Sequence, residues 1–201
     1  MNKWLVSVSI ALVLAAGGVQ AAGDAEAGKA KSATCLACHG PDGNSPNPIW
    51  PKLAGQHPAY IKKQLADFKA GARKNDLMSP MAAPLNEQDI ENLAAYFTSQ
   101  KQSPGVAAAD KVELGEKMYR AGNAATGVAA CMACHGPTGI GNPEANFPRI
   151  SGQHAAYLDK ALKDFRSGSR TNDTANMMQA VAGKMTDAEI AAVAQYIQGL
   201  H

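Results

Sequence analysis

The sequence CLACHGP at residues 35–41 occurs a second time, as CMACHGP, at residues 131–137. In each copy two residues separate a pair of cysteines, and a histidine follows the second cysteine directly. Two thiols at this spacing can form thioether bonds with the two vinyl groups of a porphyrin, and the adjacent histidine can then ligate the iron from below the ring. The motifs therefore predict two covalently bound haem c groups. The residues predicted to hold them are the four cysteines and the two proximal histidines: Cys35, Cys38, His39, Cys131, Cys134 and His135.

Three other uses of these cysteines are less consistent with the pattern. Two disulfides would suit an exported chain, but a disulfide framework needs no histidine after each pair. A redox-active pair of the thioredoxin type would lie in a βαβ unit, and no alternating pattern typical of a strand is present. A zinc site formed by all four thiols is disfavoured because 92 residues separate Cys38 from Cys131, compared with about 15–20 in zinc ribbons.

The chain contains an internal repeat that extends well beyond these motifs. PKLAGQH at residues 51–57 recurs as PRISGQH at 148–154, and the fifteen residues from 59 to 73 recur at 156–170. A period near 100 residues is too long for a solenoid and predicts two tandem domains. We place them at residues 22–103 and 104–201, with the joint in the polar stretch 100–109.

Both predicted domains have helical patterns. Asn86 and Thr186 stand at positions typical of helix N-caps ahead of apolar residues at helical spacing, and Pro58 suits a first helical position. Gly71 and Gly168 stand where the helix after Pro58 and its twin should end. The predicted fold class is all-α, with two tandem domains, each wrapped around one covalently bound haem. A domain of this size has a small core, and the haem would supply an apolar centre.

The sixth iron ligand must be selected from several methionines. Only Met78 and Met178 align as methionine with methionine in the repeat, and they are the predicted distal ligands. The others align with aliphatic residues and are predicted core positions: Met81, Met177 and Met185. His57 and His154 also align with each other, so bis-histidine ligation remains open. Their places beside helix starts favour a capping or surface hydrogen-bonding role.

The beginning of the chain resembles a secretory signal peptide. A short basic start at residues 1–3 precedes an apolar run at 5–19, and small residues lead to a predicted cleavage site after Ala21. The rival interpretation is an uncleaved membrane anchor, but the run is shorter than the ~20 residues that a spanning helix needs. The whole chain has 19 basic and 17 acidic residues, a balance that gives no support to nucleic-acid binding.

Several further stretches accompany the two motifs: AGDAEAG at 22–28, DGNSP at 42–46, RTND at 170–173 and YIQGLH at 196–201. With these stretches, both halves resemble class I cytochrome c domains, and the complete mature chain resembles the cytochrome c4 family of dihaem cytochromes. The family's axial methionines map onto Met78 and Met178. The resemblance also implies that Pro51 and Pro148 accept hydrogen bonds from the proximal histidines, and that the haem propionate edges of the two domains face each other.

The function implied by this resemblance is periplasmic electron transport, following export with a cleaved signal peptide. The expected redox partners are a cytochrome bc complex as donor and a terminal oxidase as acceptor. Peripheral association with the inner membrane is compatible with this role. A dihaem enzyme, such as a peroxidase or a thiosulfate-oxidising cytochrome, is the main alternative. Peroxidase chemistry requires an open or displaceable distal position, and a methionine is available for each iron. An oxidase subunit tethered by an uncleaved signal is a further alternative.

Overall fold

The computed structural model describes residues 23–201, so the predicted signal peptide at residues 1–21 lies outside the described part. Helices account for all the regular structure of these residues, together with two isolated β-bridges, Asn123 to Val128 and Asn142 to Phe147. The helices are α1 (Ala25–Lys31), α2 (Ala33–His39), α3 (Pro58–Ala70), α4 (Met78–Ala82), α5 (Glu87–Ser99), α6 (Ala109–Ala121), α7 (Met132–His135), α8 (Ala155–Ser167), the 3₁₀ helix η1 (Thr174–Asn176), α9 (Met177–Ala182) and α10 (Asp187–Gly199). The predicted all-α class is confirmed.

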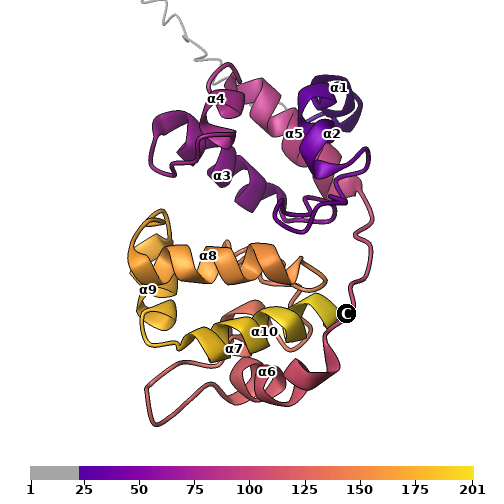
Figure 1. Cartoon of the computed structure of the whole chain (residues 1–201). Coiled ribbons are helices and arrows are strands. Elements are labelled where there is room, and N and C mark those ends of the chain that lie inside the picture. Colours follow the sequence, from indigo (N-terminus) through magenta and orange to yellow (C-terminus); the bar gives the residue numbers. More distant parts are fainter. Residues whose placement is uncertain (1–22) are drawn as a thin grey trace, which may run out of the picture.

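The helices form two separate groups joined by an extended segment, residues 100–108 (Figure 1). The first group holds α1 to α5 and the second α6 to α10. In each group the first and last helices pack against each other, α1 on α5 and α6 on α10. Helices α3 and α8 lie on the facing sides of the two groups (Figure 1). No helix of residues 23–201 has the length and apolar character needed to cross a membrane.

The helix ends follow local chemistry. Asn86 and Thr186 form capping boxes with Asp89 and Glu189 at the starts of α5 and α10, which satisfies backbone amides that have no partner inside the helix. Pro58 is the first residue of α3. Gly71 and Gly168 end α3 and α8 in the left-handed conformation, with φ of 75° and 76°. These predicted starts and ends are confirmed.

The crossing of the first and last helices in each domain depends on a glycine. A Cβ atom added to Gly28 of α1 would lie 2.0 Å from the backbone oxygen of Asn92. A Cβ atom added to Gly115 of α6 would lie 2.4 Å from the backbone oxygen of Ala192. No side chain fits at either crossing, because the obstructing atoms belong to the backbone of the partner helix.

Gly115→Ala is therefore expected to destabilise the second domain. The added methyl group would force α6 away from α10, and overpacking of this kind costs about 1–3 kcal/mol. Chemical denaturation of the holo-protein, followed by circular dichroism, measures the change. Lys117→Ala, at an exposed position of the same helix, is the matched control and should change the free energy of unfolding by less than about 0.5 kcal/mol. Equal effects of the two substitutions would contradict this account of the crossing.

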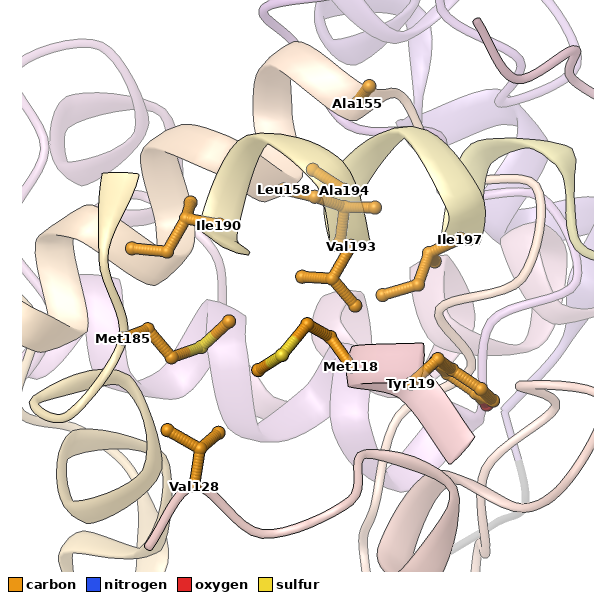
Figure 2. Close-up of a cluster of buried hydrophobic side chains, with 10 residues drawn as sticks. All are labelled: Met118, Tyr119, Val128, Ala155, Leu158, Met185, Ile190, Val193, Ala194 and Ile197. Atoms are coloured by element: carbon orange, nitrogen blue, oxygen red, sulfur yellow. The ribbon is translucent and has the colours of Figure 1, made fainter. Parts of the chain in front are cut away.

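Each domain has its own cluster of buried apolar side chains. In the first domain the cluster consists of Ile61, Phe68, Ala82, Leu85, Ile90, Leu93, Ala94, Tyr96 and Phe97. In the second domain it consists of Met118, Tyr119, Val128, Ala155, Leu158, Met185, Ile190, Val193, Ala194 and Ile197 (Figure 2). Met185 is a core residue, as predicted. The prediction is wrong for Met81 and Met177, which are both 39% exposed, because an apolar partner in the repeat does not show which way a side chain faces.

Candidate haem sites

The two cysteine pairs lie on short helices, one in each domain. Cys35 and Cys38 are both on α2, and Cys131 and Cys134 are the N-cap and third residues of the turn that forms α7. Residues three apart on a helix project from the same side, so each pair presents two thiols together. All four cysteines are free thiols. Within residues 23–201 no cluster of three or more His, Cys, Asp or Glu side chains is placed to hold a metal ion.

One thiol in each domain lies in surroundings that disfavour the thiolate. Burial raises the pKa of Cys35, and it raises the pKa of Cys131 to about 11. Disulfide exchange uses the thiolate, so burial makes these two cysteines poor redox-active thiols. Cys35 packs against the first apolar cluster and Cys131 against the second, where an apolar ring attached to them would continue the core.

A histidine in each domain is held by a proline carbonyl. His39 Nδ1 lies 2.8 Å from the Pro51 oxygen, and His135 Nδ1 lies 2.9 Å from the Pro148 oxygen. Both side chains are buried, and burial lowers the pKa of each imidazole. A carbonyl can only accept, so Nδ1 carries the proton and Nε2 keeps its lone pair. A neutral imidazole fixed in this tautomer can ligate a metal ion through Nε2.

The two predicted distal methionines begin corresponding helices. Met78 is the first residue of α4, and its backbone amide donates to Asn75 Oδ1 at 2.9 Å. Its half-buried side chain packs against the same apolar cluster as Cys35. Met178 is the second residue of α9 and is also half-buried. The three-residue insertion before it forms η1, in which Ala175 and Asn176 adopt left-handed conformations.

The residues of each domain fit a haem c group. Each domain supplies two free thiols from one helical turn, a neutral imidazole with Nε2 available and a half-buried thioether sulfur. This combination of sulfur and nitrogen donors suits a covalently attached haem with histidine and methionine as axial ligands.

The other aligned histidines are engaged in hydrogen bonds between the domains. His57 and His154 occupy the N-cap positions of α3 and α8, but neither side chain caps its helix. Instead His57 Nε2 lies 2.7 Å from the Ile140 oxygen, and His154 Nε2 lies 2.8 Å from the Ser45 oxygen. The predicted capping is absent, and the predicted hydrogen bonding is made to the other domain rather than at the outer surface.

Two arginines at equivalent positions also cross the interface. Arg170 donates to the Tyr60 hydroxyl at 3.0 Å and to Gln64 Oε1 at 3.1 Å. Arg73 donates to Gln64 Oε1 at 2.7 Å and to the Tyr157 hydroxyl at 3.3 Å. Burial raises the pKa of Tyr157, but the two guanidinium groups outweigh it and lower that pKa to about 8. The interface is thus polar and positively charged where α3 faces α8.

Sequence reasoning identified the motif residues but missed the residues that join the domains. The cross-domain side chains that it missed include Gln56, Gln64, Arg73, Gln153, Arg170 and Asn172. A signal was present for two pairs of them, since Gln56 repeats as Gln153 and Arg73 as Arg170. The repeat shows that these positions are alike, but it does not show what they contact.

Two tandem helical domains, each with a C-x-x-C-H motif and a buried histidine held by a proline carbonyl, define a c-type cytochrome with two haem sites. The family model described as Cytochrome c matches residues 25–101 and 112–201. The chain is 51% identical over 211 residues to cytochrome c4 of Azotobacter vinelandii, with both chains covered completely. The chain belongs to the cytochrome c4 family.

Solved structures and a more distant relative agree with this membership. The crystal structure of reduced recombinant cytochrome c4 from Pseudomonas stutzeri superposes with a TM-score of 0.87 at 52% identity, covering 90% of this chain and 100% of that one. A protein named thiosulfate dehydrogenase electron acceptor, from Thiomonas intermedia, is 41% identical over 175 residues, covering 83% of this chain and 78% of its own length.

Family membership confirms the two cytochrome c domains and the two covalently bound haem c groups. The chain is a dihaem electron-transfer cytochrome, and it is an electron carrier rather than an enzyme. The boundary between residues 103 and 104 stays a prediction.

Proposed function

We propose that this cytochrome carries single electrons in the periplasm, from a cytochrome bc complex toward a terminal oxidase. The signal-peptide pattern of residues 1–21 supports export, with Ala22 as the first residue of the mature chain. The absence of a membrane-crossing helix from residues 23–201 is compatible with a carrier that rests peripherally on the inner membrane. The full-length similarity to cytochrome c4 supports the carrier role.

The ligand assignment belongs to the same proposal. Cys35 and Cys38 attach the first haem and Cys131 and Cys134 the second, while the axial ligands are the two histidine–methionine pairs: His39 with Met78, and His135 with Met178. When bound, each haem supplies one iron that gains or loses one electron. The observation that carries the assignment is the hydrogen bond from each histidine Nδ1 to a proline oxygen, at 2.8 and 2.9 Å.

The protein's part in electron transfer is to hold each iron in one coordination state. The proline carbonyl orients each imidazole ring, and the methionine at the start of α4 or α9 would supply the second axial ligand of a bound haem. An iron with no open position cannot bind peroxide, and this favours a carrier over the peroxidase alternative. The Thiomonas relative is named as an electron acceptor, so this similarity also supports a carrier rather than a thiosulfate-oxidising enzyme.

The mature holo-protein is expected to carry two haems that resist extraction and to show methionine ligation. After treatment with acid acetone and denaturation, its mass should equal that of residues 22–201 plus two haems. The oxidised protein should show the weak red charge-transfer band of methionine-ligated ferric haem, with an intensity corresponding to two such haems per chain. Haem released into the solvent would refute covalent attachment. A spectrum typical of bis-histidine iron would refute the methionine ligation and favour His57 and His154.

A further inference from the structure

A glutamine in each domain binds the backbone of the other domain. Gln56 and Gln153 follow Gly55 and Gly152, which both adopt left-handed conformations, with φ values of 65° and 66°. Gln153 donates from Nε2 to the Lys52 oxygen at 2.9 Å, and its Oε1 accepts from the Lys52 amide at 2.9 Å. Gln56 makes the same pair of bonds with the backbone of Arg149, at 2.8 and 2.9 Å.

Both glutamine side chains are fixed in place. Gln56 is 7% and Gln153 is 5% exposed. Each Oε1 also accepts the amide of the following residue in its own domain, from His57 at 2.9 Å and from His154 at 3.0 Å. Three hydrogen bonds therefore determine the orientation of each side-chain amide, and the contact between the domains has a single geometry.

The backbone amide that each glutamine accepts belongs to the peptide group that orients a proximal histidine. The carbonyl of Pro51 and the amide of Lys52 form one peptide unit. Its oxygen accepts from His39 Nδ1 at 2.8 Å, and its N–H donates to Gln153 Oε1 at 2.9 Å. In the second domain the peptide unit between Pro148 and Arg149 links His135 Nδ1 to Gln56 Oε1 in the same way, at 2.9 Å on each side.

Hydrogen bonds on the two ends of a peptide group strengthen each other. When the N–H donates to a good acceptor, the group polarises and its carbonyl oxygen becomes a better acceptor. A stronger bond from histidine Nδ1–H makes the imidazole a more basic ligand, which favours the ferric state of the iron. Loss of the glutamine bond should therefore weaken the histidine bond and raise the potential of the haem in the opposite domain.

We propose that Gln153 tunes the first haem and Gln56 the second, each as a positioning residue that acts from the other domain through a proline peptide. This inference rests on the proposed assignment of His39 and His135 as proximal ligands. Its distinctive consequence is that substituting the glutamine of one domain changes the reduction potential of the haem in the other domain.

The test uses the reduced holo-protein labelled with ¹⁵N-histidine. Gln153→Met removes both side-chain bonds to Lys52 and keeps an unbranched side chain of similar size. The His39 Nδ1–H resonance should move upfield and that of His135 should stay in place. An NMR-monitored redox titration should show the equilibrium constant for reduction of the first haem raised on the order of threefold. This corresponds to a rise of about 28 mV in its reduction potential, since a tenfold change corresponds to ~59 mV. Gln56→Met should produce the mirror-image result at His135 and the second haem.

Two further variants separate tuning from a general loosening of the interface. His154→Leu removes a cross-domain bond to the Ser45 oxygen that does not involve a proline peptide, and it should leave both Nδ1–H resonances in place. Gln153→Glu supplies a stronger acceptor to the Lys52 amide and should move the His39 resonance downfield. If the methionine variant does not fold, the shift of the His39 resonance in Gln153→Glu still tests the proposal.

Shifts confined to the haem of the mutated domain, or equal shifts at both haems, would overturn the proposal. So would movement in the same direction for Gln153→Met and Gln153→Glu. A native spectrum without the methionine–ferric haem band would refute the methionine ligation, and the crossed shifts could still be scored because they depend on the histidines alone. A native band with unmoved histidine resonances would refute the coupling while the ligand assignment stands.

Discussion

Replacing Met178 with alanine is expected to remove the sixth ligand from the second iron and to leave the first iron unchanged. A thioether sulfur stabilises ferrous iron, so its loss should shift that haem's reduction equilibrium more than tenfold toward the oxidised form, a fall of more than ~59 mV. The vacated position also becomes open to small ligands. The reduced variant should bind one carbon monoxide per chain, measured by spectrophotometric titration, and the red charge-transfer band of the oxidised variant should lose half its intensity.

Neighbouring methionines provide the controls for this experiment. Met177→Ala changes the adjacent residue, which is 39% exposed, and should preserve the full band and the resistance to carbon monoxide. Met78→Ala should reproduce the Met178→Ala result at the first haem, and the double variant should bind two carbon monoxide molecules. If Met178→Ala keeps the full band, another side chain ligates the second iron.

Replacing Arg170 with methionine is expected to lower the free energy of unfolding by about 2–4 kcal/mol. The guanidinium group is buried, with its carbon 4.4 Å from the centre of the Phe165 ring. It donates to the Tyr60 hydroxyl and to Gln64 Oε1 in the other domain. Methionine retains part of the packing on the ring but removes the charged donor of the Tyr60 hydroxyl, while Gln64 Oε1 keeps only its bond from Arg73 among the two arginines. Guanidinium chloride unfolding of the holo-protein measures the loss.

Two other substitutions test whether the position and the shape of the donor matter. Arg73→Met removes the equivalent residue, which is only half-buried, and should cost about 1 kcal/mol because solvent replaces part of its hydrogen bonding. Arg170→Lys keeps the charge but loses the planar guanidinium group, whose Nη2 donates to both oxygens and whose Nε donates to Asn172 Oδ1, so its cost should lie between those of the two methionine variants. A cost below about 1 kcal/mol for Arg170→Met would contradict the central role of this residue in the interface.

Features that depend on local chemistry could be predicted from the sequence. The capping boxes at Asn86 and Thr186 depend on residues within one helical turn, and all their signals lie side by side in the chain. The haem motif is equally local. The repeat then extended each prediction to a second copy. The helix α1 was missed, although its N-cap Asp24 accepts from two backbone amides, because its seven residues carry no clear apolar stripe.

Features that depend on which faces meet could not be predicted in this way. The residues Gln56 and Gln153 are polar, and polarity alone favours exposure, yet both are buried because each finds a complete set of backbone partners in the other domain. Met81 and Met177 are apolar, and apolarity alone favours burial, yet both side chains are exposed. Each aligns with an apolar residue, but Leu77, the twin of Met177, is itself 61% exposed, so the pair marks a shared surface position.

The reciprocal glutamine contacts make the face of each half complementary to a copy of itself. Each half presents one side-chain amide and the backbone N–H and C=O of one residue, which is the isologous arrangement of a two-fold homodimer. The segment 100–108 then acts as a tether that keeps the second face at high effective concentration. Each glutamine binds only backbone atoms of Lys52 or Arg149, so the side chains of these two residues can differ without loss of either bond. The fused chain can thus diverge at its two haems and still retain the symmetric joint that holds them together.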